Sequence, residues 1–574
     1  MALTDLPYPV FIEIISYLSP REIILCRRIS SDVLKALQGH DLCVSLILTH
    51  FPRALEGRML RKSLEDGDSI ALDNGDWASV FFILARRYYH LATAVPRITT
   101  QIPMLQDADR LRGVTPWNRF LKLDDKTAPF HYWDPAWTCS TGDALLVYPG
   151  EDGVYRARDL RTELEITVPF DMTAKVVRRV RLSHGILIFE WCEEEAYHAL
   201  NEKEMAHRHF ATAYDVVSDG DEIAIPQYGG KQPSRTWSII FRSEWKIHYL
   251  GIPLSHQDRF FSTHNKTHYV VYIWQPTRSP WGEDDPLERL IVWELGEPSS
   301  YRPSLDPSEA KRPENYNGPR ILRRLINSQL DCWGIRQRDT PSLRALVLDN
   351  ETWENNKCTT NGHIFFIEEE HRWSAGPHSK QTTPRCHHVK TTGIPLIGDG
   401  PLWTDDCGGL SDGNYTMSPC WRGQRRRAYA RLMGEEEWPG RAPCWRHDDF
   451  PYLTVSEVND VAAGVRISAR HCFMMETLSV HMKPKLCVHG VESAVPWSDT
   501  SSSSSTASDK ADKKLGGAQR RKAKKKRSSD GPEGREVQFD DTIWGQVMGN
   551  GVMVGDERWL IGEDGKGKIT ILYF

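Results

Sequence analysis

Two glycine-rich stretches have residue types that could do chemistry. Gly409-Leu410-Ser411-Asp412-Gly413 fits the G-x-S-x-G turn that presents a nucleophilic serine. That turn must follow a strand and precede a helix, and neither is predicted around it. Gly562–Lys568 is close to a phosphate-binding loop, but Ile569 stands where Ser or Thr is required and a strand follows instead of a helix. We interpret it as a hairpin turn, and no catalytic residue is predicted.

Cysteine and histidine residues in the second half of the chain could bind zinc. Only Cys444-x-x-His447 has the spacing of a zinc finger, and no second half follows at a standard distance. We therefore expect free cysteines and structural histidines, with no metal and no cofactor. The other potential ligands are Cys386-His387-His388, Cys407, Cys420 and His471-Cys472.

Composition sets the class of protein. The chain has 574 residues with 40% apolar and 26% charged residues, which predicts a soluble globular protein of two or three domains. The formal net charge of -5 argues against a whole-protein nucleic-acid binder. No apolar run reaches the length of a membrane span, and the first residues do not form a signal peptide. With 12 cysteines and no C-x-x-C pair, we expect reduced thiols in the cytoplasm, the nucleus or both.

A polar, low-complexity stretch spans residues 498–535. It opens on a run of serines and has too few apolar side chains to offset the entropy of ordering, so we predict a disordered insertion. It is either a nuclear-import or nucleic-acid patch or a solvated linker. The basic residues of that patch are Arg520, Arg521, Lys522, Lys524, Lys525, Lys526 and Arg527.

The N-terminal 40 residues carry the densest pattern of the chain. Three short helices are predicted: one after Pro9, a second with a capping box of Ser19 and Glu22, and a third capped by Ser31. Apolar side chains of the first helix sweep an arc of roughly 160°, whereas one packing partner needs roughly 100°. A unit this small rarely folds alone. These helices therefore need more than one packing surface.

This stretch resembles the F-box family. The resemblance rests on Leu6-Pro7, a helix that carries Ile14, Ile15 and Leu18, the turn Ser19 to Glu22, and a second helix that ends near Ile29-Ser30. Pro9 and Val33 depart from the family pattern. The resemblance implies docking on the small adaptor subunit of a cullin-RING ubiquitin ligase. The alternative is an ordinary helical subdomain folded on the rest of the chain. The implied adaptor contacts are Leu6, Pro7, Val10, Ile14, Ile15, Leu18, Ile23, Ile24, Leu25 and Ile29.

The helical pattern continues beyond the motif. Residues 76–96 place apolar side chains on one helix face and end at Pro96. We interpret this helix as a support between the motif and the next domain. The alternative interpretation makes Arg86 and Arg87 a binding patch.

Past Trp133 the sequence changes to short β-type runs bounded by Gly, Pro, Asp and Asn. Four of these end on an acidic residue, Asp159, Asp215, Glu294 and Asp349, a loose repeat that resembles degenerate propeller blades. The chain ends inside a strand, 568–574, which suits a ring closed by its two ends. We predict a β-propeller, with a β-sandwich as the alternative. Residues 377–451, rich in Gly, Pro, Cys and Trp, are expected to leave the β scaffold.

Together these patterns predict an α+β multidomain protein. The F-box would span residues 1–45, a helical linker 46–135, and a propeller-like substrate-binding domain 136–574. Its expected role is that of a non-enzymatic substrate receptor of an SCF-type ubiquitin ligase, with adaptor, cullin and an unknown protein substrate as partners. No membrane, nucleic-acid or small-molecule partner is expected. The alternative function is an F-box scaffold that acts outside a ligase.

Overall fold

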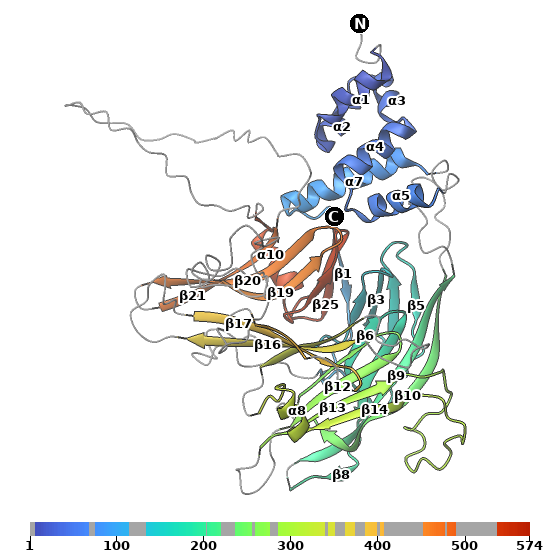
Figure 1. Cartoon of the computed structure of the whole chain (residues 1–574), viewed down its shortest axis with the longest axis vertical. Coiled ribbons are helices and arrows are strands. Elements are labelled where there is room, and N and C mark those ends of the chain that lie inside the picture. Colours follow the sequence, from blue (N-terminus) through green and yellow to red (C-terminus); the bar gives the residue numbers. More distant parts are fainter. Residues whose placement is uncertain are drawn as a thin grey trace, which may run out of the picture.

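The structure is a computed structural model of the chain (Figure 1). It describes residues 6–67, 75–113, 134–202, 204–219, 236–254, 259–275, 285–338, 342–349, 362–373, 385–398, 402–406, 452–476, 479–489 and 536–574. The predictions for residues 409–413, Cys407, Cys420, Cys444-x-x-His447 and the insertion 498–535 lie outside these described residues.

Helices fill the described chain up to Thr93. They share one apolar core, to which α1 contributes Phe11 and Ile15, and α7 contributes Phe81 and Leu84. None of the helices in the described ranges is long and apolar enough to cross a membrane. The helices are α1 (Tyr8–Ser16), α2 (Pro20–Cys26), α3 (Ser31–Leu37), α4 (His40–His50), α5 (Leu55–Asp66) and α7 (Trp77–Thr93).

The helix starts follow the capping signals closely. The predicted capping box is present: Glu22 N donates to Ser19 Oγ at 3.3 Å, and Ser19 N donates to Glu22 Oε2 at 2.8 Å. α3 is capped by Ser30 rather than Ser31, because the Ser30 hydroxyl accepts the Val33 N–H at 3.2 Å. Two adjacent serines made both registers plausible, and only the backbone geometry distinguishes them.

The strands in the described ranges form six antiparallel sheets. We number the sheets as blades 1 to 6 in chain order. Blade 1 contains β2 (Thr138–Ser140), β3 (Leu145–Pro149), β4 (Tyr155–Asp159) and β5 (Glu165–Thr167). Blade 2 contains β6 (Lys175–Ser183), β7 (Ile186–Glu193), β9 (Met205–Asp219) and β10 (Thr236–Pro253), with β8 (His198–Ala199) beside β9. Blade 3 contains β11 (Arg259–His264), β12 (His268–Gln275), β13 (Leu287–Glu294) and β14 (Arg320–Ile326), followed by helix α8 (Asn327–Cys332).

The other three blades follow the same plan. Blade 4 contains β15 (Leu343–Leu348), β16 (His363–Trp373), β17 (Arg385–Pro395) and β18 (Trp403–Asp406). Blade 5 contains β19 (Tyr452–Asp460), β20 (Val465–Glu476), β21 (Ser479–His489) and β22 (Val537–Gln538), followed by helix α10 (Asp541–Val547). Blade 6 contains β23 (Met553–Gly555), β24 (Trp559–Glu563), β25 (Lys568–Tyr573) and β1 (Ile98–Pro103).

The six sheets form a ring. The first strands of neighbouring blades contact each other: β2 contacts β6, β11 contacts β15, and β19 contacts β23. These first strands therefore line the centre of the ring. At the other end of their sheets, β5, β10 and β14 lie outermost. Between blades 2 and 3 the facing sheets share a core that includes Ile186, Trp245, Tyr269 and Trp293. This arrangement is a six-bladed β-propeller, which confirms the predicted fold and excludes the β-sandwich.

The two ends of the propeller sequence close the ring. Strand β1 pairs with β25 along its whole length, from Ile98 opposite Tyr573 to Pro103 opposite Lys568. β25 is thus an inner strand of its sheet, with β24 on its other side. Ile571 is fully buried, as predicted from the sequence, whereas Tyr573 is only half-buried. The C-terminal strand is therefore paired on both sides, and β1 forms the outer edge of the blade.

Two predicted boundaries differ from the structure. The segment 46–135, expected as a helical linker, contains β1, a strand that pairs with a partner more than four hundred residues away and so leaves little local signal. α4 also crosses the expected boundary at residue 45. Within 377–451, expected to leave the β scaffold, β17 and β18 belong to blade 4.

The repeated acidic residues mark one position in three blades. Asp159, Asp215 and Glu294 lie on β4, β9 and β13, the third strand of each blade, but Asp349 follows β15, a first strand. Asp159 Oδ1 accepts the N–H groups of Arg161 at 2.7 Å and Thr162 at 3.2 Å. Asp159 therefore stabilises the turn that leaves β4. Asp215 and Glu294 instead pair with Arg242 on β10 and Arg320 on β14, so part of the repeat has a structural cause.

The helices are fixed to the propeller by a buried ion-pair cluster. Glu557, between β23 and β24, accepts the Leu55 N–H at 2.7 Å and the Tyr88 hydroxyl at 2.6 Å. Arg87 binds both oxygens of Glu56, at 2.9 and 2.8 Å. Burial raises the pKa of Glu557, whereas at Glu56 the effect of burial is outweighed by Arg87, which lowers the pKa of that carboxyl. Arg87 is therefore part of the interdomain junction and not of a surface binding patch.

Replacing Arg87 by methionine should lower the free energy of unfolding by about 3–5 kcal/mol, because it leaves Glu56 buried without its counter-charge. Urea denaturation of the full chain measures the change. Arg86→Met is the matched control, since Arg86 is exposed on the same helix and its loss should change stability by less than about 0.5 kcal/mol. Equal stability losses in the two variants would show that the cluster does not hold the junction.

Candidate interaction site on the N-terminal helices

The residues predicted to contact an adaptor divide into three groups in the structure. Residues in the core of the helical domain cannot contact a partner unless that domain unfolds. The other residues are accessible to a partner. Ile15 and Ile23 are buried; Leu6, Leu18 and Ile24 are half-buried; Pro7, Val10, Ile14, Leu25 and Ile29 are exposed.

Helix α1 presents apolar side chains on two sides. Phe11 and Ile15 point into the helical core, with 3% and 0% of their surface exposed. Val10, Ile14 and Tyr17, spaced four and three residues apart, form a second stripe whose exposed fractions are 42%, 37% and 79%. Only part of the wide apolar arc predicted for this helix therefore packs inside the protein. The other half is available to a partner.

Helix α2 and the turn after it add two further exposed side chains. Leu25 is 48% exposed and Ile29 is 68% exposed, while Ile23 packs in the core. α2 is held against α7 by Arg21 over the ring of Tyr89, at 5.2 Å, and by Arg27 over Phe82, at 5.9 Å. These contacts fix the helix that carries Leu25. We call Val10, Ile14, Tyr17, Leu25 and Ile29 the exposed apolar set.

The structure bears on two details of the sequence-based assignment. Ile15 and Ile23 are core positions, because the helical period that places Ile14 and Leu25 outward turns their neighbours inward. Tyr8 and Tyr17, 50% and 79% exposed, were not among the predicted contacts although they lie on the same short helix. Tyr17 could have been found from its spacing, since it is seven residues after Val10 and falls on the same stripe.

The chemistry that the exposed apolar set offers is the burial of apolar surface. Four of its five members have hydrocarbon side chains, and Tyr17 adds one hydroxyl group. Burying such a side chain fully contributes about 1.5–3 kcal/mol, so several together support a stable complex. In Figure 1, α1, α2 and α3 lie at the end of the molecule away from the propeller. The set is therefore remote from the blades.

The chemical motifs that the structure describes are structural. Residues 562–568 form the hairpin that joins β24 to β25, with Asp564 N–H donating to Lys568 O at 2.9 Å, as the sequence predicted. Among the described residues, no three or more His, Cys, Asp or Glu side chains are grouped to hold a metal ion. Burial lowers the pKa of His471 to about 4, which keeps this β20 side chain neutral.

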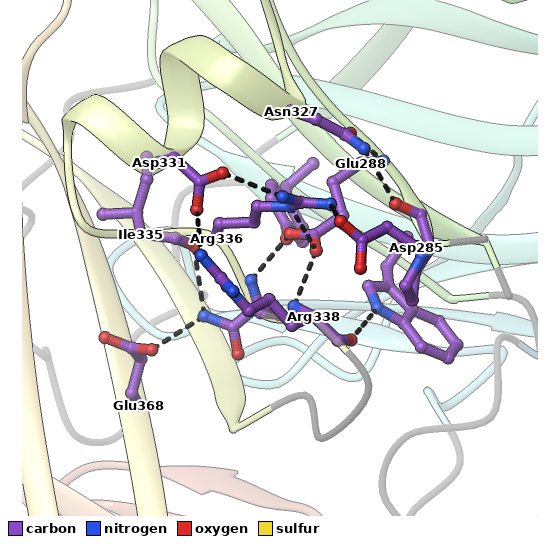
Figure 2. Close-up of polar contacts among 12 residues, drawn as sticks. Asp285, Glu288, Asn327, Asp331, Ile335, Arg336, Arg338 and Glu368 are labelled. Carbon is purple, nitrogen blue, oxygen red and sulfur yellow. Dashed lines mark hydrogen bonds and ion pairs between the residues drawn. The ribbon is translucent and has the colours of Figure 1, made fainter. Parts of the chain in front are cut away.

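A polar cluster in blade 3 has the residue types of an active site (Figure 2). At its centre Glu288, with a fully buried side chain, accepts the N–H groups of Gln337 at 2.7 Å and Arg338 at 2.6 Å and the hydroxyl of Tyr272. Arg336 lies beside it between Asp331 and Asp285, at 2.8 Å from each. Because both oxygens of Glu288 already accept hydrogen bonds from this segment or from Tyr272, the cluster holds the segment after α8 against blade 3.

Replacing Glu288 by glutamine should lower the free energy of unfolding by about 1–3 kcal/mol, because an amide group cannot accept from all three donors. Thermal and urea unfolding would measure the loss. Glu294→Gln is the control, since Glu294 pairs with Arg320, whose side chain is 69% exposed, and such pairs contribute little. A Glu288 variant as stable as this control would show that the three hydrogen bonds do not hold the segment.

Comparisons with known proteins add the following. No protein-family model matches the chain, and no curated protein matches it. The crystal structure of the Myceliophteria thermophila Cps50 (Swd1) β-propeller domain is matched at 7% identity and a TM-score of 0.25, over 83% of this chain and 100% of that one. So low a score carries no argument, and the number of blades rests on the pairing of the strands themselves. The chain is a six-bladed β-propeller protein with a helical N-terminal domain.

Proposed function

We propose that this protein is a substrate receptor of an SCF-type cullin-RING ubiquitin ligase, in which the N-terminal helices serve as an F-box. The observation that carries the proposal is the exposed apolar set on α1 and α2, at the end of the helical domain away from the propeller. Its residues coincide in part with the positions at which the sequence resembles the F-box family. Isolated exposed apolar side chains are common, but five on two neighbouring short helices and the turns that follow them favour a binding surface.

In this proposal the protein does no bond chemistry. The exposed apolar set binds the ligase adaptor, and the propeller holds a protein substrate. Both are kept at a fixed separation by the junction of Arg87, Glu56 and Glu557. The substrate is then held near a ubiquitin-charged enzyme at high effective concentration, which is the source of the rate increase. A rigid junction supports this role, since it keeps the attacking lysine of the substrate within reach.

Reconstituted ubiquitin transfer tests this function against the alternative of an F-box scaffold outside a ligase. Tagged full-length chain is purified from its own cells, and its partners are tested for ubiquitin attachment after adaptor, cullin, RING subunit and charged enzyme are added. The proposal predicts that cullin co-purifies and that at least one propeller-bound partner is modified. Adaptor binding without cullin and without transfer would favour the scaffold.

We further propose that the basic run from Arg520 to Arg527 is a nuclear-import signal. It is the densest cluster of positive charge in the sequence, with seven basic residues of eight. A fluorescent fusion of the full chain should move from the nucleus to the cytoplasm when these residues are replaced by alternating Ser and Gly. An unchanged distribution would leave the run as a solvated linker.

A further inference from the structure

A cavity lies at the outer edge of the propeller, between blades 2 and 3. Its volume is ≈ 290 Å³, near the lower end of the range for small-molecule sites. One wall is β10, the outermost strand of blade 2, and the other is formed by β13 and β14 of blade 3. Tyr301, Arg312 and Tyr316, from the segment between β13 and β14, complete it. The cavity is separate from the exposed apolar set on the helices.

The inner wall of the cavity is aromatic. Trp245 on β10 and Trp293 on β13 both line it, with ring centroids 6.4 Å apart and exposed fractions of 2% and 8%. Neither indole Nε1–H has a hydrogen-bond partner among the residues that the structure describes. Two buried donors left unsatisfied in one cavity are costly, and a polar ligand would relieve that cost. The half-buried rings of Tyr301 and Tyr316, whose centroids are 5.7 Å apart, favour a ligand with a planar ring.

The charge of the cavity is positive. Five cationic side chains line it, Lys246, Arg289, Arg312, Arg320 and Arg324, against two carboxylates, Glu244 and Glu309. Glu309 lies near Lys246 at 3.9 Å and Arg312 at 3.5 Å, and Glu244 already accepts Ser304 N–H and the Thr212 hydroxyl.

Two of the guanidinium groups have no carboxylate partner within the described part of the chain. Arg289 donates to His248 Nε2 at 3.0 Å, and Arg324 makes no hydrogen bond or ion pair there. The pairing of Ile291 with Arg324 places Arg289 and Arg324 diagonally on the same face of blade 3. Burial, together with the charges of Arg289 and Arg324, lowers the pKa of His248 to about 4, so its ring is neutral and accepts from Arg289.

We propose that this cavity binds a small molecule that combines a planar ring with a phosphate or carboxylate. The ring would lie against Tyr301 and Tyr316, which line the cavity and are half-buried. The anionic group would accept hydrogen bonds from Arg289, Arg324 and the indole N–H groups. The small volume and the enclosure by the segment 295–319 favour a free small molecule over an extended peptide. The proposal departs from the expectation that proteins are the only partners of this chain, and it does not depend on the ligase function.

Ligand-observed NMR on the full chain tests the proposal with three probes: phenyl phosphate, inorganic phosphate and benzyl alcohol. Phenyl phosphate carries both required features, and each of the other two carries one. We expect phenyl phosphate to bind with a Kd of about 1 mM or tighter, and each single-feature probe to bind at least about tenfold more weakly. Raising the salt concentration should weaken binding of phenyl phosphate.

Arg324→Gln should weaken phenyl phosphate binding about tenfold or more, and because Arg324 is exposed, the variant is expected to fold. Arg156→Gln is the matched control, because Arg156 is a half-buried arginine of blade 1 that is paired with Asp152 and lies outside the cavity. This variant should bind phenyl phosphate as the unmodified chain does. The proposal is overturned if phenyl phosphate does not bind, if inorganic phosphate binds equally well, or if Arg324→Gln has no effect. A phosphotyrosine peptide that binds at least tenfold tighter than phenyl phosphate would instead assign the cavity to a protein side chain.

Discussion

A chain that ends after Gly567 is expected to be insoluble or rapidly digested by protease, because the deletion removes the whole of β25. Ile569, Ile571, Leu572 and Phe574 of this segment are all buried. At about 1.5–3 kcal/mol for each, their loss amounts to about 6–12 kcal/mol, comparable with the entire stability of a folded domain, about 5–15 kcal/mol. The deletion also leaves β1 without its strand partner and exposes an edge of β24, both of which favour aggregation.

The measurement is the soluble fraction after expression, followed by limited proteolysis and size-exclusion chromatography. Tyr573→Phe is the matched control in the same strand, since the Tyr573 hydroxyl has no hydrogen-bond partner in the described part of the chain. Its removal should change the free energy of unfolding by less than about 0.5 kcal/mol. A truncated chain that stays soluble, monomeric and as stable as Tyr573→Phe would contradict closure of the ring by β1 and β25.

Ile14→Glu combined with Ile29→Glu should abolish adaptor binding while the protein stays folded. Both side chains are exposed, 37% and 68%, so the glutamates remain solvated in the free chain. In a complex that covers the exposed apolar set, two charges would be buried without partners, at a cost of several kcal/mol. Each 1.4 kcal/mol is a factor of ten, so affinity should fall by about a thousandfold or more. Calorimetric titration of adaptor into the full chain gives the two affinities.

The design separates binding from folding through two further variants. Val461→Glu, in the turn between β19 and β20, changes an apolar side chain that is 69% exposed and lies outside the set, so adaptor affinity should not change. Ile15→Asp places a charge in the helical core and should unfold the helical domain, which circular dichroism would detect. If Ile14→Glu/Ile29→Glu binds adaptor as Val461→Glu does, the exposed apolar set is not the docking surface.

The sequence predicted the local features of the helical domain well. The capping box at Ser19 and Glu22 needs only residues three apart, and the apolar arc of α1 needs only the helical period. The sequence could not show which half of that arc faces the core and which half is exposed. Whether Ile14 or Ile15 faces the core depends on where α4 and α7 lie. The role of Arg87 could not be predicted for the same reason. Its partners Glu56 and Glu557 are 31 and 470 residues away, and no residue near Arg87 in the chain indicates them.

For the propeller, the many short β-type runs and the strand at the end of the sequence predicted the architecture. They did not predict the number of blades. The acids Asp159, Asp215 and Glu294 recur on third strands, while Asp349 does not, so the repeat could not be counted reliably. The cavity between blades 2 and 3 had no sequence signal at all. Trp245, Arg289 and Arg324 come from three strands, and only the packing of two blades brings them together.

The most direct test of the proposed function is a titration of purified adaptor into the unmodified full-length chain, followed by addition of cullin. The proposal predicts a one-to-one complex with a Kd of about 1 µM or tighter, onto which cullin assembles. It also predicts that Ile14→Glu/Ile29→Glu prevents this assembly and that Val461→Glu does not. Absence of a complex at adaptor concentrations of about 100 µM, with the chain shown to be folded, would contradict the receptor function.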